Sequence, residues 1–213
     1  VCALPGVSLD YSKFVPLIER AISRGFVDVE AGMYVKRGLW FGFDLGVDIG
    51  ALPGKRWFNN YPTAWEARDA VTDAQRKRVK AGKTLALCPM RTRDTRALPW
   101  ESCRVFPMGA VPKPLEPDVM RPVSDHTRSG LKEATDMTRF KHSLRAYEEI
   151  AEHLQPGYSM RMSDVDGAFL LLPLAPHLWP YFLHWFHGTE EGKGEEMVLY
   201  MHICADFGAA GVP

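Results

Sequence analysis

The spacing of apolar residues predicts two amphipathic helices. Over residues 11–24, large apolar side chains recur every three or four positions: Phe14, Leu17, Ile18, Ala21 and Ile22. Pro16 falls in the first turn of this helix, where proline is tolerated, and Gly25 provides its stop. Residues 138–154 carry a second stripe, formed by Phe140, Leu144, Tyr147, Ile150, Ala151 and Leu154. Pro156 and Gly157 end that helix.

A third helix and several strands complete the predicted elements. Thr63 and Glu66 form a capping-box pattern that opens a helix running to about Ala81. Alternating runs predict strands at residues 160–164 and 197–204, and short strand pieces are expected at 104–107, 109–112 and 120–125. Frequent prolines make residues 83–117 mostly extended connection, and residues 32–54 are expected to form short strands or irregular structure. Strands mixed with helices, without a regular βαβ rhythm, indicate the α+β class.

Composition is compatible with one large domain or two small ones. The chain has 213 residues, of which 46% are hydrophobic, and its formal net charge is zero. The four cysteines show no CxxC spacing, so we expect reduced thiols rather than a disulfide framework. His184, His187, His202 and Cys204 could be imagined as zinc ligands. Their aromatic-rich surroundings favour ordinary packed or surface histidines.

The chain is expected to be intracellular, in cytoplasm or nucleus, and not secreted, because no signal peptide is recognised. Residues 168–186 carry no formal charge, but Pro173, Pro176 and Pro180 would break a membrane-spanning helix. Both ends, at Val1 and Pro213, look cut. We therefore expect a fragment of a longer protein with no membrane segment.

Charge is unevenly distributed along the chain. Between residues 76 and 96 there are eight basic residues and a single acid, Asp94. The bases that we expect to bind nucleic acid are Arg76, Lys77, Arg78, Lys80 and Lys83. From Glu101 onward acids outnumber bases by sixteen to ten. This distribution suits a polyanion-binding surface beside a metal site, although charge alone equally allows a solvated helix face.

Two carboxylates follow the predicted strand at residues 160–164. Asp164 ends that strand, and Asp166 follows it by two residues. Carboxylates at the end of a strand are held by rigid backbone yet face solvent, as a hard divalent cation requires. A polar turn without a ligand is the alternative interpretation of this stretch alone.

Three segments, taken in order, resemble the reverse transcriptases of retrotransposons, most strongly over residues 109–213. Lys113 followed by Arg121-Pro-Val-Ser-Asp125 resembles their fingers motif, with Leu131-Lys132 in place of its closing "LN" pair. The run from Asp164 to Phe169 resembles the first palm motif. The ending from Phe207-Gly208 to Pro213 is similar to the motif "LPFGLxxAP". More weakly, residues 25–60 resemble elements of the DIRS class, which carry a tyrosine recombinase.

The resemblance implies an RNA-directed DNA polymerase that uses Mg²⁺ or Mn²⁺ and acts on a template–primer and deoxynucleoside triphosphates. By this resemblance, Asp164 is the catalytic carboxylate and binds metal together with the Val165 carbonyl. The same resemblance places five residues at the incoming nucleotide: Lys113, Arg121, Phe169, Phe207 and Gly208. Lys113 and Arg121 would reach the triphosphate, and Phe169 would exclude a 2′-hydroxyl.

The resemblance also implies two regions, an amino-terminal extension at 1–108 and, at 109–213, fingers with a partial palm whose sheet is antiparallel. Asp164 is expected in an open cleft shared with Lys113 and Arg121, and Asp166 is expected to point away. Asp125 is expected to make structural hydrogen bonds on the fingers.

Four departures from the motifs weaken the expectation of activity. Asp206 stands where the family has proline, Lys132 where it has asparagine, and His126 where an apolar or aromatic residue is common. The Tyr-x-Asp-Asp motif is absent, so we do not expect this chain to polymerise by itself.

Two other functions remain open. The chain could be a degenerate or domesticated remnant that binds nucleic acid without catalysis. Less favoured is a glycosyltransferase in which Asp164-Val-Asp166 is a manganese-binding DxD motif, because no nucleotide-binding βαβ segment precedes it.

Overall fold

A computed structural model describes residues 12–90, 94–136, 138, 157, 168–189 and 196–206. Its helices are α1 (Val15–Ser23), α2 (Val29–Phe41), α3 (Pro62–Glu66) and α4 (Arg68–Lys80), with short 3₁₀ turns η1 (Ile49–Ala51), η2 (Thr95–Ala97), η4 (Ala168–Leu171) and η5 (Pro176–Tyr181). Its strands are β1 (Lys55–Trp57), β2 (Thr84–Pro89), β3 (Cys103–Val105), β4 (Met108–Lys113), β5 (Glu116–Ser124), β6 (Leu183–His187) and β7 (Met197–His202).

A five-stranded mixed sheet forms the centre of the molecule, in the order β1-β3-β6-β7-β2. The β1–β3 and β3–β6 pairs are parallel, whereas β6–β7 and β7–β2 are antiparallel. The predicted mixture of helices and strands is confirmed, but the expected antiparallel sheet is correct only for the β6-β7-β2 half. The sheet takes strands from both sides of the boundary predicted at residues 108 and 109.

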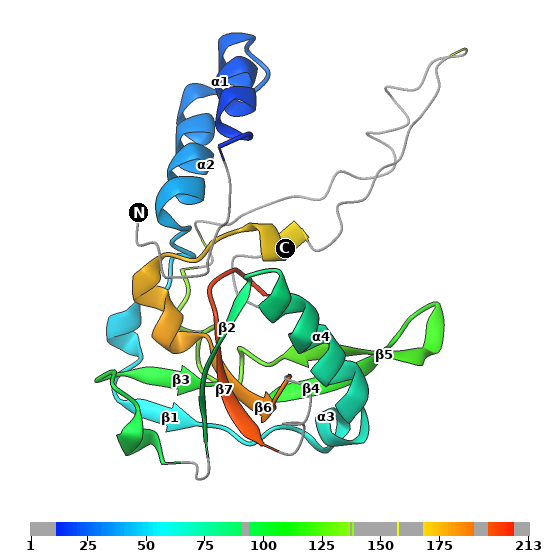
Figure 1. Ribbon diagram of the computed structural model, residues 1–213. Helices are drawn as coiled ribbons and strands as arrows, with labels where there is room; N and C mark the ends of the chain where they lie inside the picture. The colour runs from blue at the N-terminus through cyan, green and yellow to red at the C-terminus, as the bar shows by residue number, and fades with distance from the viewer. Residues whose placement is uncertain are drawn as a thin grey trace.

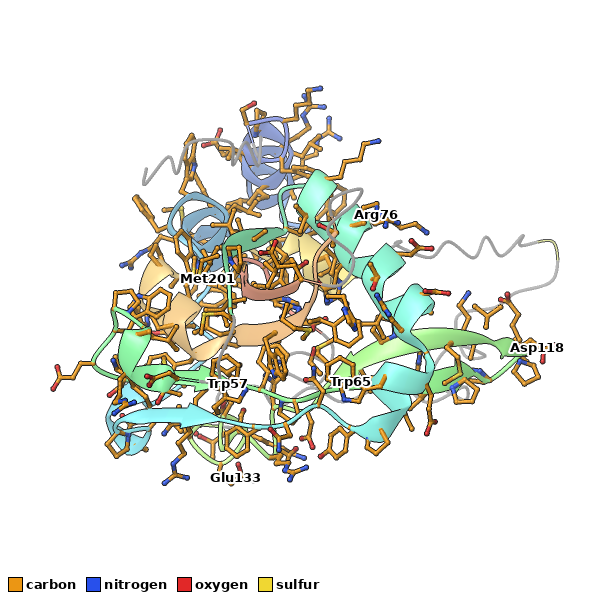
Figure 2. The ribbon with its side chains drawn as sticks, turned by 60° about the horizontal axis from the view of Figure 1, so that its bottom comes forward. Trp57, Trp65, Arg76, Asp118, Glu133 and Met201 are labelled. Carbon is orange, nitrogen blue, oxygen red and sulfur yellow. The ribbon has the colours of Figure 1, made fainter. Side chains whose placement is uncertain are left out.

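A separate two-stranded antiparallel ribbon, β4–β5, projects from this centre (Figure 1). Its register runs from Met108 opposite Ser124 to Lys113 opposite Glu116, with an irregularity between Pro112 and Lys113. Figure 2 shows Asp118 at the far end of the ribbon. The strand pieces predicted at 104–107, 109–112 and 120–125 correspond to β3, β4 and β5 and are confirmed.

The two faces of the sheet pack into two apolar clusters. Along β6, Leu183 and Trp185 face one cluster, while Phe186 faces the other, as the period-two alternation of a strand requires. Trp65 of α3 stacks on Phe186 with ring centroids 5.0 Å apart and also meets the edge of Trp185. Figure 2 shows Trp57 and Trp65 along this part of the molecule. The sheet, α3, α4 and η5 are called the body below.

Helices α1 and α2 form a hairpin, called the α1–α2 hairpin below, that stands away from the body (Figure 1). The predicted helix at 11–24 is confirmed as α1, with proline in its first turn and Gly25 at φ 70°. The prediction of strands or irregular structure at 32–54 is wrong for its first part, because α2 continues to Phe41. Asp28 caps α2 by accepting a 2.9 Å hydrogen bond from the Ala31 N–H.

The capping box predicted at Thr63 is also wrong. Two helices lie where one was expected. Helix α3 begins at Pro62 and ends at Glu66, and the non-helical residue Ala67 separates it from α4. The Thr63 hydroxyl accepts a 3.2 Å hydrogen bond from the Ala110 N–H, so it ties α3 to the ribbon instead of capping a helix. The predicted end of the helix near Ala81 is confirmed: α4 ends at Lys80, and Gly82 follows with φ 65°.

The remaining sequence predictions have different outcomes. The strand predicted at 197–204 is confirmed as β7, whereas β2 lies in a region expected to be mostly connection. The helix at 138–154 and the strand at 160–164 fall outside the described residues. In the parts of the chain that are described, no helix is long and apolar enough to cross a membrane.

Candidate functional site

The β4–β5 ribbon carries both cations of the predicted fingers motif. Arg121 lies opposite Val111, and Lys113 lies two residues further along β4 toward the ribbon's tip. The Lys113 ammonium is 3.4 Å from the Glu116 carboxylate, an exposed pair that solvent screens. Both side chains are exposed and therefore accessible to a ligand at this end of the molecule.

Asp125, immediately after β5, makes the structural hydrogen bonds expected of it. Its carboxylate accepts a 2.5 Å bond from the Tyr61 hydroxyl and a 2.9 Å bond from the Arg128 N–H. Burial alone would raise the pKa of Asp125, but these donors outweigh it and hold the pKa below its usual range. Asp125 therefore fixes the turn after β5 against the segment that leads into α3.

Three of the predicted nucleic-acid-binding bases lie exposed on α4. They are Arg76, Lys77 and Lys80, and Figure 2 shows Arg76 on the outside of the molecule. Arg76 also pairs with Asp73 and donates a 3.2 Å hydrogen bond from Nε to the Thr189 carbonyl. Lys83, after α4, is only half-buried. These positions form a basic surface at the end of the helix.

Arg78 is the exception, and its prediction as a nucleic-acid-binding residue is corrected by the structure. Its side chain is 10% exposed and lies 3.1 Å from Asp206, whose side chain is 2% exposed. The Ser124 hydroxyl donates to the same carboxylate. Burial by itself would raise the pKa of Asp206, but Arg78, His202 and Ser124 lower it well below its usual range. Arg78 is thus committed to a buried ion pair and is not available to phosphate.

Three buried histidines surround this ion pair and the ring of Phe106. The centroids of His126, His184 and His202 lie 4.5, 5.5 and 5.6 Å from that ring. His184 Nδ1 and His202 Nε2 face each other at 2.9 Å, so one donates and the other accepts. Neither ring nitrogen of His126 has a hydrogen-bond partner.

Burial keeps these imidazoles neutral. It lowers the pKa of His126 to about 4 and that of His202 to about 3, and it lowers the pKa of His184 well below the ordinary value. The expectation of packed histidines is confirmed for His184 and His202. His126 also packs as an aromatic ring, 5.1 Å from Phe182, which explains how it occupies a position where the fingers motif has an apolar residue.

Several predicted site residues fall outside the described structure. Asp164, Asp166, Val165, Phe207 and Gly208 are not described. The backbone of Phe169 lies in η4, but its side chain is not described. In the described residues no three His, Cys, Asp or Glu side chains gather to hold a metal ion. The predicted magnesium or manganese ligands, Asp164 and Val165, therefore stay a prediction.

Sequence reasoning missed the link between Arg78, Asp206 and Ser124. The three residues lie on α4, after β7 and at the end of β5, far apart in the chain. The one available indication was an acid, Asp206, between the apolar end of β7 and Phe207. A charge in such a position requires a buried partner, but sequence alone does not say which cation supplies it.

Comparison with models of protein families found no match to this chain, and comparison with curated proteins found none either.

Proposed function

We propose that this chain forms the fingers and the first part of the palm of a retroelement reverse transcriptase. One observation carries the proposal: an exposed antiparallel ribbon presents Lys113 and Arg121 on its two strands. A guanidinium and an ammonium on neighbouring strands suit the oxygens of a nucleoside triphosphate.

The buried ion pair supports the same proposal. Asp206, the residue directly before Phe207 and Gly208, is held by Ser124 at the end of the strand that carries Arg121. Asp206, the last described residue before Phe207, therefore lies at the base of the ribbon. The proposal requires the segment after Asp206 and the strand that carries Arg121 to serve one nucleotide site, and this position of Asp206 supports it.

The basic end of α4 fits a nucleic-acid strand in this proposal. Helix α4 packs against β5, so Arg76, Lys77 and Lys80 belong to the structural unit that carries the ribbon. Magnesium would be held by Asp164 and Val165 and would supply the charge neutralisation that phosphoryl transfer needs. The described residues bind and orient the two substrates: the ribbon binds the triphosphate, and α4 contacts the phosphate backbone of the nucleic acid.

Triphosphate binding tests the role of the ribbon. Titration of a deoxynucleoside triphosphate should show binding that Arg121→Ala weakens by about tenfold or more, and that Arg121→Lys restores only in part. Arg56→Ala removes an exposed arginine from β1, in the other sheet, and should leave the affinity unchanged. Equal losses in Arg121→Ala and Arg56→Ala would show a non-specific charge effect and contradict the proposal.

Salt dependence tests the α4 surface. A labelled RNA–DNA primer–template should bind with an affinity that falls steeply as salt rises, because bound phosphates release counterions. The double substitution Lys77→Glu and Lys80→Glu should lower both the affinity and the salt slope. Primer–template binding without any triphosphate binding would favour the remnant that binds nucleic acid without catalysis.

A further inference from the structure

One face of α2 exposes more apolar surface than is usual for a helix of a monomeric protein. The exposed fractions are 65% for Val29, 49% for Met33, 51% for Tyr34, 49% for Trp40 and 65% for Phe41. At 100° per residue these side chains fall within one continuous arc of about 140°. Aromatic residues, methionine and arginine on one continuous surface are typical of the centre of a protein interface.

The α1–α2 hairpin itself does not cover this face. Helix α1 packs on another side of α2, where Gly32 leaves room for the Ile22 side chain and Lys36 pairs with Glu19. No residue of α1 is buried. Figure 1 shows the hairpin standing off the body, which lies toward the C-terminal end of α2. There the Tyr34 ring meets that of Phe43, with centroids 5.8 Å apart.

The charges on this face are self-complementary. Glu30 and Arg37 are the two charged residues in the exposed arc, and neither makes an ion pair in the described residues. They are seven residues apart, about 10.5 Å along the axis, so each points outward on the same side. Two copies of α2 packed antiparallel about a two-fold axis between Met33 and Tyr34 bring residue i opposite residue 67 − i. That single arrangement sets Glu30 opposite Arg37 twice.

We propose that α2 is a dimerisation helix that pairs antiparallel with α2 of a second copy of this chain. Met33 and Tyr34 then flank the two-fold axis, each beside the same residue of the partner, and Glu30 pairs with the partner's Arg37. Each contact occurs twice, as in any two-fold symmetric interface. The inference does not depend on the proposed function.

The surface beside Phe41 fits the same arrangement. A groove of about 520 Å³ runs between α2 and the body and is lined by residues that include Arg37, Phe41, Pro176 and His177. In the antiparallel pair the C-terminal end of α2, which carries Phe41, lies beside the N-terminal end of the partner's α2. In this chain Phe26 is 77% exposed, just before α2, so its ring is available to enter the partner's groove.

A charge exchange tests the pairing directly. Sedimentation equilibrium should show a dimer of the unmodified chain with a dissociation constant in the micromolar range. Glu30→Arg and Arg37→Glu each place two like-charge pairs in the interface and should weaken the dimer about tenfold or more. The double variant E30R/R37E restores both pairs and should recover dimerisation. An equimolar mixture of the two single variants should form a heterodimer, because each supplies what the other lacks.

Matched controls exclude a general effect of charge or misfolding. Arg20→Glu changes an exposed charge on α1, outside the proposed interface, and should leave the dimer intact. Trp40→Ser should weaken the dimer while keeping the circular dichroism spectrum unchanged. An unmodified chain that stays monomeric up to about 1 mM overturns the proposal. So does a dimer that neither single variant weakens, or one that E30R/R37E fails to restore.

Discussion

The body and the α1–α2 hairpin differ in which side chains they bury and which they expose. The body buries groups that water would favour, including three imidazoles, a guanidinium and a carboxylate. The hairpin exposes groups that water disfavours, and α1 buries no residue at all. The packing that stabilises the fold therefore lies mostly in the body, and the exposed apolar surface of the hairpin is the surface that the proposed pairing of two copies would cover.

Buried polar groups are costly unless every one is paired, so the body should respond sharply to changes that the hairpin tolerates. The four predictions below test this difference, beginning with the largest expected effect.

Removing Arg78 should have the largest effect. Arg78→Ala leaves Asp206 charged, buried and without its cation, and should lower the free energy of unfolding by about 3–5 kcal/mol in urea denaturation. Arg76→Ala, at an exposed pair on the same helix, should change it little. In the double variant Arg78→Met with Asp206→Asn, the loss should be smaller than in Arg78→Ala. An equal loss would show that the ion pair is not what the body depends on.

Acid should destabilise the body through the buried histidines. Their folded pKa values lie below the unfolded value of 6.5, so the unfolded chain binds more protons. Stability is thus complete above about pH 6.5 and falls as the pH drops toward 4. His126 alone should account for about 2 kcal/mol by pH 5. The depressed pKa of Asp206 acts only at lower pH.

The His126→Phe variant provides the comparison. It keeps an aromatic ring beside Phe106 and Phe182 and removes the titration. Urea denaturation at several pH values should show a flatter profile between pH 6.5 and 5. An unchanged profile would mean that His126 does not titrate across folding.

Tyr61→Phe should have a moderate effect. It removes the hydroxyl that donates to Asp125, a hydrogen bond to a charged group worth about 1.5 kcal/mol. The pKa of Asp125 should rise, because one of the donors that stabilise its charged form is gone. Denaturation and carboxyl chemical shifts measure the two effects, and a loss of stability with no rise in the Asp125 pKa would point to packing instead.

Trp40→Ser should have the smallest effect on folding. At concentrations where the chain is monomeric, we expect a change below about 0.5 kcal/mol, because the indole is half exposed. Trp65→Ser, which removes the ring stacked on Phe186, should cost about 3 kcal/mol by contrast. Similar costs for both tryptophans would remove the distinction between hairpin and body.

Sequence alone predicted the elements that local pattern determines. The apolar stripe at 11–24 predicted α1, short strand pieces predicted β4 and β5, and alternation predicted β7. Prediction from the sequence failed at α2, because Gly32 and Gly38 resembled loop residues. Both glycines serve close packing: a Cβ at Gly38 would lie 2.2 Å from the ring of Phe43. The Asp28 cap was the available indication of a helix.

The candidate site shows the same limit. The resemblance to a fingers motif predicted a role for Lys113 and Arg121, and the two residues lie on one ribbon. Sequence reasoning could not reveal that the Arg78 side chain is buried and so is not part of the basic surface, because its partner Asp206 lies 128 residues away. The buried face of α4 carries Val71, two turns before Arg78, and Gln75, about one turn before it, but this spacing does not identify the partner of Arg78.

The order of strands in the central sheet has a consequence for how the chain folds as it is made. Strand β7, the last described strand in the chain, lies between β6 and β2. In the described sheet β2 pairs with β7 and with no other strand. Its N–H and C=O groups therefore have no strand partner until more than a hundred further residues have been synthesised. Asp206 arrives only after β7 as well, and until then Arg78 lacks its counter-charge. Completion of the body is therefore a late, non-local event, and on the ribosome the emerging chain must keep β2 from pairing with other strands until β7 emerges.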